Sequence, residues 1–205
     1  MGALNGRMSP LGFRALGSVE DWDKALGQIV RYRFQPVDLD AGKEQSFGWV
    51  QLTDPFETSF TKSSIFFGEH LVGLTFRMDG IQIPAGQFRL HLTKRIRDLK
   101  TERKGEEISK REQARLKDDL RADWIRKVIP TIKLYEVVFH SATNRVWFFG
   151  KSKSVVDTFL QVFLDTFGVN LQLDSAYTAA LQQLGPAVAE KLLELEDVRF
   201  SEEAE

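Results

Sequence analysis

Lysine and arginine side chains gather in one part of this chain, at a density that suits the binding of phosphate groups. Fourteen of the 28 basic residues lie between Phe88 and Lys127, together with eight acidic residues, so this segment has a net charge of +6. Clustered cations displace the counterions condensed on nucleic acid, which gives salt-sensitive, sequence-independent binding. The segment therefore indicates an anionic partner, with nucleic acid as the first candidate.

The C-terminal part of the chain compensates this charge. The stretch from Val155 to Glu205 holds two basic and ten acidic residues, and the whole chain has a net charge of −1. A blander interpretation of the basic segment is a solvated helix surface, with Lys94–Asp98 and Arg115–Asp119 as ion pairs one helical turn apart.

Helical periodicity is expected to position the basic side chains. Apolar residues recur in steps of three and four after Pro84, and a second such pattern follows Gly105 and ends at Pro130. Ser109 and Glu112 form a capping-box sequence at the start of this second helix. The two expected apolar stripes consist of Ala85, Phe88, Leu92, Ile96 and Leu99, and of Gln113, Leu116, Leu120 and Trp124. We expect a helical hairpin, or one long helix broken near Gly105.

The candidate DNA-binding side chains are the cations on the outer faces of these helices. Each would donate charge to a phosphate rather than read a base. They are Lys94, Arg97, Lys100, Lys104, Lys110, Arg111 and Arg115.

The flanking parts of the chain predict an α+β fold: a mainly antiparallel sheet with packed helices, from which the charged hairpin protrudes. Strands are expected at 11–16, 47–53, 64–67, 74–78, 132–140, 145–149 and 169–173. Helices are expected from Ser18 to before Gln35, from Ser152 or Ser154 to Gly168, and over 175–195 with a break at Gly185.

Two turns and three regions complete the expected organisation. Asp79-Gly80 between apolar residues indicates a tight hairpin, and Ser141 to Asn144 indicates a second turn. The strand over 74–78 is expected to bury one face only, and Gly48-Trp49-Val50 is expected to lie in the core. The regions are an N-terminal part of the body (1–83), the basic hairpin (84–130) and a C-terminal part with an acidic helical tail (131–205).

Motifs that would indicate catalysis or a resident cofactor are missing. The chain has no cysteine, its three histidines lack metal-ligand spacing, and neither glycine-rich nucleotide-binding motif occurs. We therefore expect neither a catalytic nor a metal site, and no cofactor. Lys151 and Lys153, near a helix start, are expected to make at most a secondary phosphate contact. A nuclease using Asp38, Asp40 and Glu57 around a divalent metal is a minor alternative.

The order of these features resembles the RdgC family of recombination-associated proteins. The resemblance is carried by Phe34-Gln35-Pro36, by Phe47-Gly48-Trp49-Val50, by Ile83-Pro84 opening a charged helix, by Leu116-Lys117-Asp118-Asp119-Leu120 running to Ile129-Pro130, and by the block from Glu136 to Phe167 with Arg145-Val146-Trp147. Proteins of that family continue into a longer C-terminal region than this sequence has.

The resemblance implies a non-catalytic, sequence-nonspecific double-stranded DNA-binding protein. It further implies a homodimer in the cytoplasm, associated with the nucleoid, that acts in recombination or replication and restrains a RecA-type recombinase. The sequence itself has no apolar run long enough to span a membrane. The alternative function is a protein-interaction or self-assembly module, in which the basic hairpin pairs with an acidic surface without DNA.

Overall fold

The chain forms five helices and six strands in the part that the structure describes. This computed structural model describes residues 9–104 and 106–175, and beyond them only Tyr177, Thr178, Leu181, Gly185 and Lys191. The expected helix over 175–195 and its acidic tail therefore lie almost entirely outside the described residues. The elements are β1 (Leu11–Ala15), α1 (Trp22–Arg31), β2 (Gln45–Gln51), α2 (Lys62–Ile65), β3 (Leu71–Gly80), α3 (Ala85–Glu102), α4 (Lys110–Ile125), β4 (Thr131–His140), β5 (Arg145–Phe148), α5 (Lys153–Phe167) and β6 (Leu171–Leu173).

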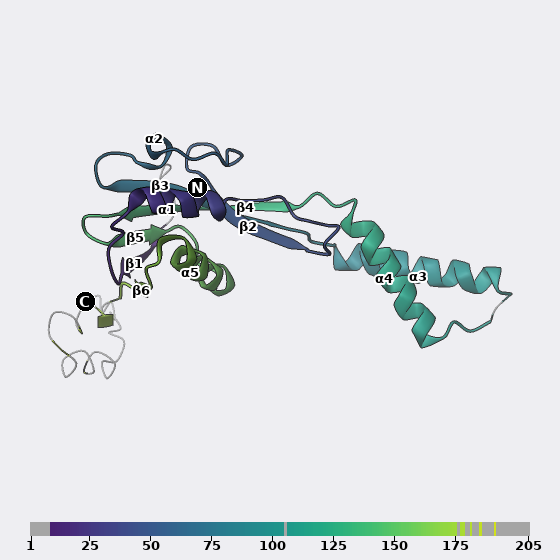
Figure 1. Cartoon of the computed structure of the whole chain (residues 1–205). Coiled ribbons are helices and arrows are strands. Elements are labelled where there is room, and N and C mark those ends of the chain that lie inside the picture. Colours follow the sequence, from purple (N-terminus) through teal and green to yellow (C-terminus); the bar gives the residue numbers. More distant parts are fainter. Residues whose placement is uncertain are drawn as a thin grey trace, which may run out of the picture.

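The six strands form one antiparallel sheet in the order β2-β3-β4-β5-β1-β6, which confirms the expected α+β fold (Figure 1). Strands β3 and β4 pair along their full ten residues, from Leu71 opposite His140 to Gly80 opposite Thr131. The chain leaves β3 at Gly80 and re-enters the sheet at Thr131, so α3 and α4 start and end at neighbouring points. Both helices project beyond the end of the sheet (Figure 1).

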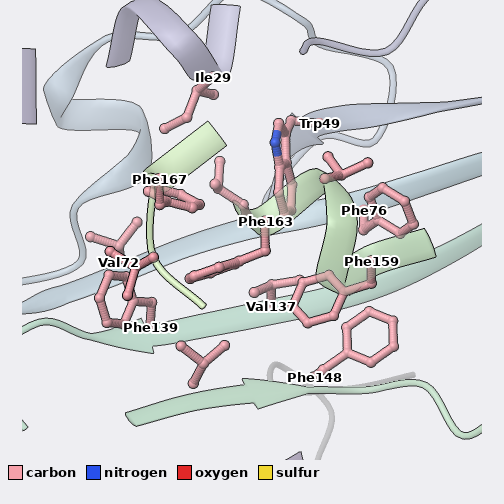
Figure 2. Close-up of a cluster of buried hydrophobic side chains, with 14 of the residues drawn as sticks. Ile29, Trp49, Val72, Phe76, Val137, Phe139, Phe148, Phe159, Phe163 and Phe167 are labelled. Atoms are coloured by element: carbon pink, nitrogen blue, oxygen red, sulfur yellow. The ribbon is translucent and has the colours of Figure 1, made fainter. Parts of the chain in front are cut away.

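Helix α5 packs its aromatic side chains on one face of the sheet (Figure 2). The Phe159 ring stacks on Phe148 with centroids 4.1 Å apart, and it also contacts Phe76. Trp49 is fully buried, as expected, and its indole N–H donates to Thr166 Oγ1 at 2.8 Å. This hydrogen bond satisfies the one polar atom that the indole brings into the core.

The ends of the body helices follow capping rules, with one correction. Gly168 ends α5 in the left-handed conformation at φ 70°, as its sequence predicts. The predicted start of α1 at Ser18 is wrong, because Asp21 is the N-cap and its carboxylate accepts from the amides of Asp23 and Lys24. The carboxylate cap three residues later shortens the helix by about one turn.

Residues 64–67 are not a strand, contrary to prediction. Lys62–Ile65 form a short helix, since Thr61 and Ser64 make a reciprocal capping box. Of the apolar residues that suggested a strand, Ile65 and Phe66 pack in or against the core from this helical turn. Ile65 is buried, whereas the Phe66 ring packs edge-on against Trp22 at 5.1 Å. A short apolar run does not by itself distinguish a strand from a buried helical turn.

Asp79 and Gly80 do not form the predicted tight turn, and β3 does not have one exposed face. The two residues are the end of β3, still paired with β2 and β4 on either side. Arg77 and Asp79 are buried on the sheet face opposite α5, where Arg77 donates twice to the Asp79 carboxylate, at 2.9 and 2.7 Å. The alternating pattern predicted that this face of β3 is exposed to solvent, but the face is buried and its two charged side chains pair with each other.

The segment after β2 covers this opposite face over β3. The Arg77 guanidinium donates to the Pro55 carbonyl at 3.0 Å and lies 4.2 Å from the Phe34 ring centroid. Ser141–Asn144 form the predicted turn, with Asn144 at φ 53°. The division into three regions at 83/84 and 130/131 stays a prediction, although α3 and α4 fall within its middle part.

Gly48 is predicted to be indispensable for folding. A Cβ at this position would lie 2.6 Å from both the Cα and the N of Phe34, where neither backbone can yield. We expect Gly48→Ala to lower the free energy of unfolding by about 3 kcal/mol, measured by urea denaturation. Gly27→Ala is the matched control, because no atom lies within 4 Å of the added methyl in the middle of α1, and it should raise stability by up to about 1 kcal/mol. Equal stability of the two variants would contradict this packing.

Candidate nucleic-acid interface

Helices α3 and α4 form the predicted hairpin, held together by a small apolar contact. Phe88 and His91 of α3 both pack edge-on against Trp124, with ring centroids 5.6 and 5.1 Å away. The predicted stripe residues on both helices are half-buried, except that Leu120 is fully buried and Ala85 is exposed. Since so few side chains are buried, the hairpin depends on caps and ion pairs as well as on apolar packing.

The predicted capping box begins α4. Ser109 Oγ accepts from the Glu112 amide at 3.3 Å, and the Glu112 carboxylate accepts from the Ser109 amide at 3.1 Å. Arg103, at the end of α3, donates to the same carboxylate at 2.8 Å. These hydrogen bonds, with that from Arg103 contributing most, lower the pKa of the Glu112 carboxyl below its ordinary value. Glu112 therefore ties the end of α3 to the start of α4 at neutral pH, and acidification through its lowered pKa removes this tie.

The seven predicted contact residues lie on the hairpin surface. Six of them are exposed, and Lys100 is half-buried along the apolar stripe. Arg97 approaches Asp98 at 4.0 Å, the longest ion-pair distance among the described residues. Within the described part of the chain, the other six form no ion pair, and the expected pairs Lys94–Asp98 and Arg115–Asp119 do not form. The interpretation of this surface as a solvated helix face was therefore wrong about the two ion pairs that it predicted.

Other arginines of the hairpin have structural roles that the sequence did not reveal. Arg95 pairs with Asp123 at 3.5 Å and links the two helices. Arg121 makes a bidentate contact with Glu44, 2.7 Å to each carboxylate oxygen, and so links α4 to the residue that precedes β2. Glu44 lies 77 positions away in sequence, and it comes close because β3 pairs with both β2 and β4, which places Gln45 and Thr131 on either side of Gly80. No sequence signal could have found this pair.

The hairpin thus divides its cations into two groups. Three arginines, Arg95, Arg103 and Arg121, each have a carboxylate partner within 3.5 Å and position the helices. Apart from Arg97, which approaches Asp98 at 4.0 Å, the remaining cations of the hairpin form no ion pair within the described residues, and all of them except Lys100 are exposed. Each exposed cation without an ion pair can neutralise a phosphate.

The alternative metal site has no support in its geometry. Asp38 accepts from the Ala41 amide at 3.0 Å and Glu57 accepts from the Ser59 amide at 2.7 Å, so each carboxylate caps its own turn. The latter hydrogen bond lowers the pKa of Glu57. No group of three or more metal-ligating side chains lies together among the described residues.

A cavity of about 460 Å³ lies between α1 and the end of α5. Exposed charged side chains, including Lys24, Arg31 and Asp165, line it. The buried hydroxyl in its lining, that of Thr166, donates to the Val162 carbonyl and accepts from the Trp49 indole.

No protein-family model matches this sequence, and the comparison with curated proteins finds no match. The resemblance to the RdgC family therefore stays a prediction. Within the described range of the chain, no helix has the length and apolar composition needed to cross a bilayer.

Lys104 offers a way to remove a candidate cation without weakening the hairpin. It follows the C-cap of α3 and adopts φ 55°, a conformation that favours glycine. We expect Lys104→Gly to protect the Arg103 amide, which donates to Leu99 at 3.1 Å, more strongly from hydrogen exchange than Lys104→Ala does. The difference should correspond to about 1 kcal/mol. Identical exchange in the two variants would contradict the left-handed cap.

Proposed function

We propose that this protein is an RdgC-like, sequence-tolerant double-stranded DNA-binding protein whose basic helices contact phosphates. One observation carries the proposal: most cations of the projecting hairpin are exposed and make no ion pair among the described residues. An exposed cation that supports no fold contact is free to exchange water and counterions for phosphate oxygens.

The hairpin has dimensions suited to several phosphate contacts. Helix α3 has 18 residues and is therefore about 27 Å long. Phosphates of one DNA strand follow each other every 3.4 Å or so along the duplex axis, which gives the helix several within reach. Flexible lysine and arginine side chains on a solvent-exposed face follow the backbone and carry no information about base sequence.

The proposal includes the properties that the resemblance implies. The protein would act without catalysis or cofactor, as a homodimer in the cytoplasm on nucleoid DNA, modulating recombination or replication by restraining a RecA-type recombinase. Self-association is also favoured by Ile132 and Leu134, which are 43% and 44% exposed on β4, on the sheet face opposite α5. Apolar side chains that alternate along one open sheet face favour an interface with another protein.

A salt series with random-sequence duplex tests the proposed function. If about five phosphates are neutralised, the logarithm of the binding constant should fall against the logarithm of salt concentration with a slope near −4 to −5. The informative variant replaces Lys94, Arg97 and Lys100 by glutamine and Lys104 by glycine. Glutamine keeps much of the stem with which Lys100 covers apolar surface, so the fold should survive while the slope becomes shallower by about three to four.

The control for this series replaces four exposed cations outside the hairpin, Lys24, Arg31, Arg33 and Arg145, by glutamine. It should retain the slope of the unaltered chain. A slope near zero for the unaltered chain would refute DNA binding. Sedimentation of the unaltered chain without DNA, at low and high salt, then tests the alternative function. Self-association that is lost at high salt would indicate that the basic hairpin pairs with an acidic protein surface.

A further inference from the structure

The sheet face that carries α5 continues past that helix toward the hairpin. Tyr135 and Val137 lie on this face of β4, where Tyr135 packs against the Phe148 ring and Val137 belongs to the core. By strand alternation Lys133 points to the same side. Lys133 is exposed and is only two residues from Thr131, where the chain returns from the hairpin.

Helix α5 points its N-terminal end toward the hairpin. Phe159, in the middle of the helix, packs on Phe76, four residues from the end of β3 at Gly80. Phe167, at its last position, packs on Phe139, at the opposite end of β4 from Thr131. The start of α5 is therefore nearer to the root of the hairpin than the end of α5 is, and the whole helix lies on the body of the sheet, apart from the hairpin (Figure 1).

The loop into α5 adds two further lysines to this region. A Cβ placed on Gly150 would lie 2.9 Å from Cδ1 of Tyr135, so the loop lies directly against that ring. Lys151 follows Gly150, and Lys153 begins α5. Since two residues of a strand span about 7 Å, Lys133 lies about that far along β4 from the ring that the loop contacts.

These three lysines resemble the unpaired cations of the hairpin in their surroundings. Lys133, Lys151 and Lys153 are exposed, and none of them forms an ion pair within the described ranges. Asp157, one turn after Lys153 on α5, is exposed and makes no ion pair with Lys153. No ion pair within the described residues accounts for the positions of these three lysines.

We propose that the DNA-binding surface extends from the hairpin onto the body, and that Lys133, Lys151 and Lys153 contact the phosphates of the same duplex. This inference rests on the proposed function, and it assigns to that function a second contact region. A rigid duplex suits two separated groups of cations, because its backbone continues in a fixed direction from one to the other. The hairpin then contacts one end of the bound stretch of duplex, and the lysines at the start of α5 contact the other end.

The test compares two triple variants of the full chain on a duplex of about two helical turns, by fluorescence anisotropy between about 50 and 200 mM salt. The first replaces Lys133, Lys151 and Lys153 by glutamine. The second replaces Lys24, Arg31 and Arg145, three exposed cations on α1 and at the end of β5 farthest from the hairpin root, and so removes the same charge. Circular dichroism confirms that both remain folded.

The body-lysine variant should bind at least about tenfold more weakly at about 0.1 M salt, with a slope shallower by about one, because the four hairpin cations already account for three to four of the total slope, while the control matches the unaltered chain. If the unaltered chain binds but the two variants have equal slopes, the second contact region is refuted and the proposed function stands. If the unaltered chain does not bind duplex at any salt concentration, both proposals fail together.

Discussion

The full-length pairing of β3 with β4 is the constraint on which the arrangement of this protein depends. Because Gly80 lies opposite Thr131, the chain must leave and re-enter the sheet at adjacent points. Residues 81–130 must therefore lead away from the sheet and return to the same place. Two helices of similar length satisfy this requirement, since one carries the chain outward and the other returns it. The basic segment is thereby displayed at one end of the sheet, away from the aromatic core (Figure 1).

The end of β3 is reinforced on both faces, which gives the hairpin a rigid base. On one face, Phe76 belongs to the aromatic core around α5. On the other, Arg77 and Asp79 form a buried ion pair that also binds the Pro55 carbonyl. Such a pair contributes little net stability compared with apolar residues, but losing one partner would leave a buried charge and cost about 3–5 kcal/mol. The contact between Arg121 and Glu44 then ties α4 to the same end of the sheet.

The sequence predicted the hairpin well because local rules determine it. The step pattern up to Leu99, the capping box at Ser109 and the break before it act over a few residues, and so does the stop of α5 at Gly168. The same rules failed wherever tertiary contacts decided the outcome. Asp79-Gly80 has turn composition but is held in the sheet by neighbours on both sides, and Phe66 and Phe67 belong to a helix exit rather than to a strand.

The candidate site shows the same division. Most of the unpaired cations were found from spacing alone, because facing away from an apolar stripe is a local property, whereas Lys100 lies along the stripe and is half-buried. The structural arginines were not found, since Arg121 meets Glu44 only through the folded sheet. Lys133 lay in a strand pattern with no sign of its neighbours, and the contact of the Gly150 loop with Tyr135 was needed to connect it to Lys151.

A lysine acylation footprint, read by mass spectrometry with and without duplex DNA, shows directly whether the exposed cations of the hairpin contact DNA. It needs no variant, and Lys94, Lys104 and Lys110 of the hairpin and Lys24 of α1 are all exposed in the free protein. The account predicts that bound duplex slows acylation of the three hairpin lysines, that high salt restores their reactivity, and that Lys24 reacts at the same rate throughout. Unchanged hairpin lysines in a chain that is demonstrably bound to DNA, or protection of Lys24 instead, would contradict it.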